Sequence, residues 1–433
     1  MSRPDAARAA SAREVASTRS GSSADAALAR RLHGLLEQKL TEFPWPVRVT
    51  DWRGGSARLG GEAEHWCGRP LEIHVGTAAA GRTLVAEDVM GFLEKVLGGE
   101  AALEGNLYLL PLLRRHARLS LGWRDGLRFT LRHLAFQTRS RARVNVRSHY
   151  DLPQEALDLY LDRSYRAYSC GIFEAPRRLD RSELVRAGTG EADAFDSLEK
   201  AQWRKFRDAV DFIAPAAGET LLDVGCGYGG QLRVALESHP FGRVVGWTHS
   251  ANQVREGRRL LASLDPQRWE IHEGDYRSEG RVFDHITSTG MVSHVGPRGL
   301  VPYVRQVRRR IRRGGRYVHH ALMKVHDPLP LDLQLGPVFH KRFVWPGFHW
   351  FSLGTHVKAL ERNGFEVKAL VNLSDHYVKT AAAWYERLEA QREAFSRRVG
   401  EATTQAWRIY LAGSSGDIAN HGIHVYRVYC EAV

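Results

Sequence analysis

The stretch DVGCGYGG, residues 223–230, decides the fold of this chain. It overlaps the end of a short apolar run at residues 220–224 and precedes a segment with helical spacing. Glycines let the backbone turn sharply and approach a ligand closely. A buried strand, a glycine-rich turn and a helix in this order therefore predict a ligand-binding turn in an α/β domain.

Strands and helices alternate along the chain around this turn. Short apolar runs predict further strands at residues 243–247, 283–288 and 316–321, and helical segments separate them. Such alternation is typical of a domain with helices packed on a parallel sheet. We therefore expect an α/β domain with a mainly parallel sheet.

The residues of the turn favour one class of ligand over another. A dinucleotide-binding turn has the pattern GxGxxG and a carboxylate at the end of the next strand. This chain has the pattern Asp-x-Gly-x-Gly-x-Gly-Gly, and its first acid after the second strand is Glu256. Both features disfavour a dinucleotide, and the pattern resembles motif I of S-adenosylmethionine (AdoMet) methyltransferases.

Composition limits the kind of protein further. The 433 residues include 62 Lys and Arg against 49 Asp and Glu, which gives a net charge of +13, and 43% are hydrophobic, enough for packed cores. No run of eighteen apolar residues and no secretory signal is recognisable, so we expect no membrane-spanning helix. The four cysteines form no CxxC pair, which disfavours a metal site or a disulfide framework and favours a reducing cytoplasm. The positive charge leaves nucleic acid, an anionic membrane and an anionic small molecule open as partners.

Changes of pattern divide the chain into four parts. Residues 1–27 lack apolar periodicity and predict a disordered tail, and residues 28–113 predict a small α+β domain. Residues 114–147 carry ten arginines interleaved with apolar side chains and predict a basic amphipathic linker. This linker would lie on anionic lipid or pack its apolar side on a neighbouring domain. The α/β pattern falls within residues 148–433.

A series of short motifs in this last part resembles the cyclopropane fatty acid synthase family, which includes the mycolic acid methyltransferases. In chain order the motifs are HYDL (149–152), YSCGIF (168–173), the turn at 223–230, GWTHSANQ (246–253), GDYR (274–277), STGMVSHVG (288–296), VHHAL (318–322), VWPG (344–347), GFEV (364–367) and NLSDHY (372–377). The resemblance implies a Rossmann-like class I methyltransferase, with a mainly parallel seven-stranded sheet and helices on both faces. A looser likeness at residues 93–107 implies that the small N-terminal domain is lipid-carrier-like.

The resemblance also implies two groups of site residues. The residues expected to hold AdoMet are Tyr168, Ser169, Asp223, Gly225, Gly227, Gly229, Thr248, His249, Gln253, Asp275 and Tyr276. The residues expected to act in catalysis are Cys170, His320, Tyr377, Ser293 and His294. In the family a bound bicarbonate acts as the base. It is held by a cysteine, a histidine, a tyrosine, a backbone amide (here that of Leu322) and a glutamate.

Ser293 stands where the family has this glutamate. A serine hydroxyl donates and accepts hydrogen bonds but carries no charge, so it cannot replace a carboxylate as a base. In one interpretation bicarbonate or water still binds through Cys170, His320, Tyr377 and the Ser293 hydroxyl. In another the base has changed, and the product is a methylene or methyl-branched chain instead of a cyclopropane. In a third interpretation the protein has lost its catalytic activity.

The resemblance implies an AdoMet-dependent C-methyltransferase that adds a carbon to the double bond of an unsaturated acyl chain in membrane phospholipid. An alkene is a poor nucleophile and must be positioned, and the cation that forms needs aromatic faces and exclusion of water. Trp345, Phe348, Trp350 and Phe351 are candidates for such a wall, or for ordinary core. The alternatives are a non-catalytic lipid-binding protein, and a methyltransferase for another substrate.

The expected partners follow from this function. They are unsaturated phospholipid acyl chains, an anionic membrane surface, a second copy of the chain and a separate reductase, whereas nucleic acid is not expected. The protein would be cytoplasmic and peripherally associated with the membrane. Seven arginines at residues 305–316 form a second basic cluster, which is either a solvated helix face or a contact for phosphate headgroups. His319, where the family has an aliphatic residue, is expected to pack at a strand end.

Overall fold

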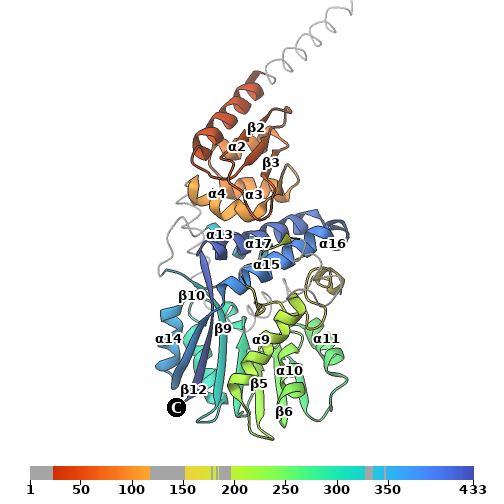
Figure 1. The fold of residues 1–433 in the computed structure, drawn as a ribbon, viewed down its shortest axis with the longest axis vertical. Coiled ribbons are helices and arrows are strands. Elements are labelled where there is room, and N and C mark those ends of the chain that lie inside the picture. The colour runs from red at the N-terminus through yellow and green to blue at the C-terminus, as the bar shows by residue number, and fades with distance from the viewer. Residues whose placement is uncertain are drawn as a thin grey trace, which may run out of the picture. The chain divides into compact units, whose positions relative to one another are not determined.

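The computed structural model describes residues 23–117, 152–176, 179–181, 184, 197–326, 335–345 and 348–433. The chain divides into two compact units, Met1–Gly122 and Trp123–Val433 (Figure 1). The division falls inside the predicted linker, of which residues 118–147 lie outside the described residues. Within the described part, no helix is long and apolar enough to cross a membrane, and no group of three His, Cys, Asp or Glu side chains is placed to hold a metal.

The first unit is a small α+β domain. Its sheet has the order β2-β1-β3-β4, with β1 (Val47–Thr50) parallel to β3 and the other pairs antiparallel. The remaining elements are a helix at residues 23–40, β2 (Ser56–Leu59), β3 (Leu71–Val75), α2 (Ala78–Val85), α3 (Val89–Leu97), β4 (Ala101–Gly105), η1 (Leu107–Leu109) and α4 (Leu110–His116). The side chain of Asp88 accepts a hydrogen bond from the Gly91 N–H at 2.8 Å and so caps the start of α3.

The prediction of a disordered tail at residues 1–27 is wrong for residues 23–27. Residues 23–27 form the first turns of the helix at residues 23–40. Three of these five residues are alanine, the residue with the highest helix propensity, and Ala29, Leu32 and Leu40 farther along the helix are buried. Residues 1–22 lie outside the described residues.

The second unit has a mainly parallel sheet, as the sequence predicts. The strand order is β11-β12-β9-β8-β5-β6-β7, and the five strands from β9 to β7 are parallel. β12 is antiparallel to both of its neighbours, and the short β10 adds to β9. The strands are β5 (Thr220–Val224), β6 (Arg243–Thr248), β7 (Trp269–Glu273), β8 (His285–Thr289), β9 (Arg316–Lys324), β10 (Phe351–Ser352), β11 (Phe365–Asn372) and β12 (Ile423–Ala432).

Helices cover both faces of this sheet because the strands are apolar on both sides. On β5, Leu222 and Val224 pack with the face that carries α12 and α14, whereas Leu221 packs against α9 and α10. The helices are α7 (Gln154–Leu157), α9 (Leu198–Ile213), α10 (Gly230–Ser238), α11 (Ala251–Leu261), η2 (Tyr276–Ser278), η3 (Met291–His294), α12 (Leu300–Arg310), α13 (Leu335–Phe339), η5 (His340–Val344), α14 (Leu353–Glu361), α15 (Ser374–Ala390), α16 (Arg392–Val399) and α17 (Glu401–Ala419). Helices α15 and α17 pack together and lie across one end of the sheet (Figure 1).

Several arginines of the second basic cluster make bonds within the fold. Arg308 donates to the carbonyls of Gly364 at 3.0 Å and Val433 at 2.6 Å. Arg316 donates to the carbonyls of Phe212 and Ile213, at the carboxyl end of α9, where a cation is favourable. These two side chains therefore join α12 and β9 to neighbouring elements.

Candidate active site

A cleft opens at the carboxyl ends of β5, β6 and β8, where ligands bind in open α/β sheets. Seven of the predicted cofactor residues line it: Tyr168, Gly225, Gly227, Thr248, His249, Gln253 and Tyr276. Trp247, Met291 and Pro302 add apolar walls. Residues from four separate motifs thus meet at one cavity, which we call the cofactor cleft.

The glycine-rich turn forms the floor of the cofactor cleft. Gly225, Gly227 and Gly229 all have positive φ, at 83°, 53° and 81°, a region that side chains disfavour. A Cβ on Gly225 would lie 2.7 Å from the Met291 side chain, whereas a Cβ on Gly227 would meet nothing within 4 Å. The space in front of Gly227 is therefore open, so a ligand can lie directly against the backbone.

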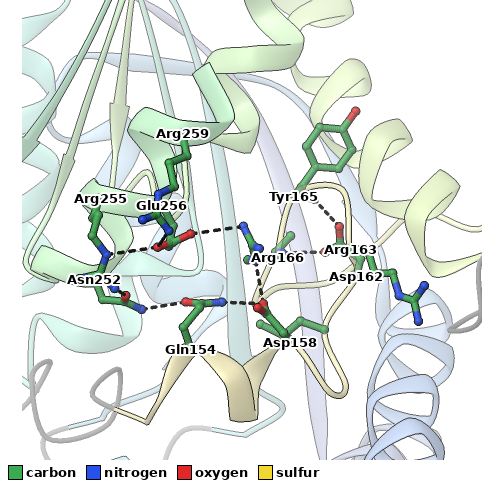
Figure 2. Close-up of polar contacts among 12 residues, drawn as sticks. Gln154, Asp158, Asp162, Arg163, Tyr165, Arg166, Asn252, Arg255, Glu256 and Arg259 are labelled. Atoms are coloured by element: carbon green, nitrogen blue, oxygen red, sulfur yellow. Dashed lines mark hydrogen bonds and ion pairs between the residues drawn. The ribbon is translucent and has the colours of Figure 1, made fainter. Parts of the chain in front are cut away.

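The end of β6 carries hydroxyl and amide groups instead of a carboxylate. Thr248 Oγ1 donates to Gln253 Oε1 at 2.5 Å, and both side chains line the cleft. Glu256 points elsewhere and pairs with Arg259 and Arg166 (Figure 2). The backbone of Gly227 and the pair Thr248–Gln253 would hold the polar groups of AdoMet, and the rings of Trp247 and Tyr276 its adenine. The residues present fit this cofactor, which supplies an electrophilic methyl group when bound.

Four predicted cofactor residues lie beside the cleft instead of lining it. Ser169 faces a second cavity, and Gly229 begins α10. Asp275 accepts from the backbone N–H of Arg277 at 2.9 Å and shapes η2. Asp223 is 3% exposed and accepts from Thr287 Oγ1 at 2.8 Å, and burial raises its pKa to about 7. The motifs predicted these residues as cofactor contacts, but the carboxylates of Asp223 and Asp275 make hydrogen bonds within the fold.

The loop that carries Tyr168, Ser169 and Cys170 is held from two sides. Before it, the buried carboxylate of Asp162 accepts from two backbone N–H groups, and a polar network joins residues 154–166 to α11 (Figure 2). After it, the buried Lys205 on α9 donates to Ser169 Oγ at 2.8 Å. The loop is therefore fixed against the helix that follows the cofactor strand β6.

A second cavity shares Tyr168, Gly290 and His294 with the cofactor cleft. Four predicted catalytic residues meet in it from distant elements: Cys170 from the loop, His294 from η3, His320 from β9 and Tyr377 from α15. The rest of its lining is mostly apolar or aromatic, with Leu322, His340, Trp345, Phe348, Trp350, Tyr410, Ser414, Ile418 and Ile423. We call this space the substrate cavity.

The polar groups of the substrate cavity are uncharged. Burial raises the pKa of the Cys170 thiol to about 12, so the thiol stays protonated. Burial lowers the pKa of His294 to about 4. It also takes the pKa of His320 well below its usual value, and the nearby cations of Arg427 and Lys205 lower it further. These imidazoles are therefore neutral at physiological pH.

Ser293 is not among the residues that line either cavity, contrary to its predicted role. It is 1% exposed, and its hydroxyl has no hydrogen-bond partner in the described structure. The short helix η3 carries both residues, but only His294 is among the residues that line the cavities. Among the described residues, no carboxylate lines the substrate cavity, so the residues do not fit the family's arrangement for bicarbonate.

Of the aromatic residues near β10, some line the substrate cavity and one belongs to the ordinary core, which are the two roles predicted for them. Trp345, Phe348 and Trp350 line the substrate cavity, with the His294 ring 5.9 Å from Trp345 and 5.7 Å from Phe348. Phe351 instead belongs to the core beneath the sheet. His319 also belongs to the interior, where its ring nitrogens lie 2.9 Å from Tyr317 Oη and 3.0 Å from His356 Nδ1.

Three polar residues of the substrate cavity are not among the residues predicted from the sequence: His340, Tyr410 and Ser414. They come from η5 and α17, and none of the three belongs to a motif used in the resemblance. The histidine in the mostly apolar run of residues 338–345 was the available signal, because a polar ring there needs a buried partner.

Comparison with known proteins agrees with the motif series. The family described as mycolic acid cyclopropane synthetase matches residues 137–428. The chain is 32% identical to a probable fatty acid methyltransferase of Pseudomonas putida over 285 residues, 65% of this chain and 67% of that one. It is 26% identical to the cyclopropane-fatty-acyl-phospholipid synthase of Escherichia coli K12 over 363 residues, 83% of this chain and 87% of that one.

A solved structure shows the same arrangement of the second unit. A mycolic acid cyclopropane synthase complexed with SAH and CTAB superposes with a TM-score of 0.59 at 25% identity, over 67% of this chain and 98% of that one. The fold class and the resemblance inferred from the motifs are thereby confirmed. The chain belongs to the mycolic acid cyclopropane synthetase family and is an AdoMet-dependent methyltransferase.

Proposed function

We propose that the enzyme methylates a carbon of the double bond in an unsaturated fatty acyl chain of a membrane phospholipid. The observation that carries this proposal is the shared wall of Tyr168, Gly290 and His294, which joins the cofactor cleft to an aromatic cavity. An apolar chain fits a cavity whose lining is mainly apolar and aromatic. The names of the relatives, a fatty acid methyltransferase and a phospholipid synthase, support the same substrate class.

The substrate cavity suits the demands of alkene methylation. The walls fix the double bond beside the methyl donor, and such positioning lowers the barrier for a weak nucleophile. The faces of Trp345, Phe348 and Trp350 stabilise the positive charge that develops on the acyl chain. All three rings are less than 9% exposed, so they also keep water from capturing the cation.

We further propose a methylene or methyl-branched product instead of a cyclopropane. The support is Ser293, which stands where the resemblance implies a glutamate and is not among the residues that line the substrate cavity. A methyl branch would require a separate reductase to saturate the methylene group. The base that removes the proton must then come from another part of the cavity.

We place the enzyme at an anionic membrane surface of the cytoplasm. The net charge of +13 and the arginine-rich residues 114–147 support this proposal. A non-catalytic lipid-binding protein is disfavoured, because the open space at Gly227 and the polar pair Thr248–Gln253 are features of a cofactor cleft.

Lipid mass spectrometry tests the proposed function. The full chain is expressed in a host that lacks such an enzyme, beside the variant Gly227→Trp, which fills the cofactor cleft. We expect unsaturated acyl chains heavier by one CH₂ unit with the unaltered chain and none with the variant. Unshifted phospholipids, from a protein that binds AdoMet, would refute the phospholipid substrate.

A further inference from the structure

His340 is a buried histidine of the substrate cavity that the motif series leaves unassigned. It is the first residue of η5, and its ring lies edge-on to Trp350 at 5.6 Å and Tyr410 at 5.2 Å. These neighbours hold the imidazole in one orientation. The cavity that it lines also contains Cys170, His320 and Tyr377.

The hydrogen bonds of His340 fix its tautomer. Nδ1 lies 2.7 Å from the carbonyl oxygen of Gly336, and a carbonyl only accepts hydrogen bonds. Nδ1 must therefore carry the proton of the neutral ring, which leaves an unprotonated lone pair on Nε2. Nε2 lies 3.3 Å from Ser414 Oγ, whose hydroxyl can donate to it. A histidine with a backbone carbonyl at one nitrogen and an unprotonated lone pair at the other is arranged as a proton acceptor.

The other titratable groups of the cavity are poorer acceptors. Burial raises the pKa of Cys170 to about 12 and also raises that of Tyr410, so both groups keep their protons. At His320, the cations of Arg427 and Lys205 oppose a further positive charge. His294 lies on the wall shared with the cofactor cleft, on the side of the methyl donor, and His249 opposes its protonation.

Two neighbours of His340 offset part of the effect of its burial. Burial lowers its pKa, but the Gly336 carbonyl and the carboxylate of Asp417 on α17 both raise it. The charged group near His340 is the carboxylate of Asp417, whereas the charged groups near His320 are the cations of Arg427 and Lys205. The imidazolium that forms after proton transfer is therefore best tolerated at this position.

We propose that Nε2 of His340 is the base that removes the proton from the methylated acyl chain, in the place of the base held by the family glutamate. This inference rests on the proposed function. The double bond uses its electron pair to bond the methyl carbon, the sulfur–carbon bond breaks, and a cation remains on the adjacent chain carbon. The hydrogen on the methylated carbon moves with its electron pair to this cation, so the positive charge now lies on the carbon that bears the methyl group. A C–H bond of the methyl group then breaks. Its electron pair forms the new double bond, and the proton passes to Nε2.

Two variants of His340 test the proposal in the full-length enzyme. In His340→Asn the amide can still donate towards the Gly336 carbonyl, and in His340→Gln the amide extends towards Ser414, but neither side chain is a base. We expect turnover on oleoyl phospholipid vesicles to fall by about 10²-fold or more, as for loss of a general base. AdoMet affinity, measured by calorimetry, should stay within about twofold, because His340 does not line the cofactor cleft.

Further readouts separate a base from a merely structural residue. Unaltered enzyme should lose turnover as the pH falls through the pKa of His340, and the variants should lack this limb. The small residual product of the variants should contain hydroxylated chains, because an unquenched cation is captured by water. The matched control Ser414→Ala keeps the base and should retain at least about a tenth of the turnover with the same product.

The dependence of turnover on bicarbonate distinguishes His340 from a bound bicarbonate as the base. In buffer freed of carbon dioxide, added bicarbonate should leave the turnover of the unaltered enzyme unchanged. Turnover that depends on bicarbonate, or His340 variants with near-normal turnover and the same pH profile, would overturn the role of His340. If the unaltered enzyme binds AdoMet but methylates no lipid, the proposed function itself fails, and the inference fails with it.

Discussion

Substitution of Gly227 by alanine separates cofactor binding from backbone strain. Gly227 has a φ of 53° and open space in front of its Cα, on the side of the cofactor cleft. Gly218 has a φ of 87° and equally open space, but it lies in the turn before β5, outside the cleft. Alanine costs about 1–2 kcal/mol in the left-handed region. Both variants should therefore lose a similar free energy of unfolding.

The two variants should differ in AdoMet affinity. Only the new methyl group at residue 227 occupies the space where the cofactor meets the backbone. We expect Gly227→Ala to weaken AdoMet binding by at least about tenfold, or about 1.4 kcal/mol, and Gly218→Ala to leave it unchanged. Urea unfolding measures the stability, and titration calorimetry measures the affinity. Equal AdoMet affinity in the two variants, with both proteins folded, would refute the placement of the cofactor on this turn.

Three other predictions concern the two cavities and the residues beneath them. Cys170→Ala and Tyr377→Phe should lower turnover far more than AdoMet affinity, because both side chains line only the substrate cavity; a loss of affinity as large as that of turnover would contradict this. Lys205→Met removes the donor to Ser169 Oγ and should weaken both AdoMet binding and turnover, whereas the exposed Lys200→Met on the same helix should change neither. Burial raises the pKa of Asp223 from 3.8 to about 7. Between about pH 4 and pH 7 the folded state therefore binds a proton at Asp223 that the unfolded state does not bind. The free energy of unfolding falls as the pH rises through this range. Asp223→Asn keeps an acceptor for Thr287 and should gain stability relative to the unaltered protein over that pH range; a difference in urea midpoints that is independent of pH would contradict the buried carboxylate.

The sequence predicts those parts of the fold that depend on residues close together in the chain. The run at residues 220–224 is apolar on both faces, so it had to be a central strand, and positive φ at Gly225 and Gly227 follows from the glycines. The third strand begins at His285 instead of residue 283, because Phe283 makes only an isolated bridge to Ile311. Strand ends depend on partners that are distant in the sequence, so they are less predictable.

The substrate cavity was only partly predictable for the same reason. Cys170, His320 and Tyr377 were found through their motifs, although they lie on a loop, a strand and a helix. Ser293 is in a motif, but the turn of η3 takes its side chain out of the lining. The orientation of His340 depends on its contacts with the Gly336 carbonyl and with Ser414 on α17. The contact with Ser414 arises from packing between η5 and α17, and no local sequence pattern predicts it.

Transfer of a labelled methyl group tests the central claim most directly. The purified full-length enzyme is incubated with AdoMet carrying carbon-13 in its methyl group and with vesicles of oleoyl phospholipid, and the lipid is examined by NMR. We predict that the label appears in the acyl chain as an exocyclic methylene carbon. A cyclopropane signal would contradict the proposed product, and label that stays in AdoMet or enters only the headgroup would contradict methylation of the acyl chain.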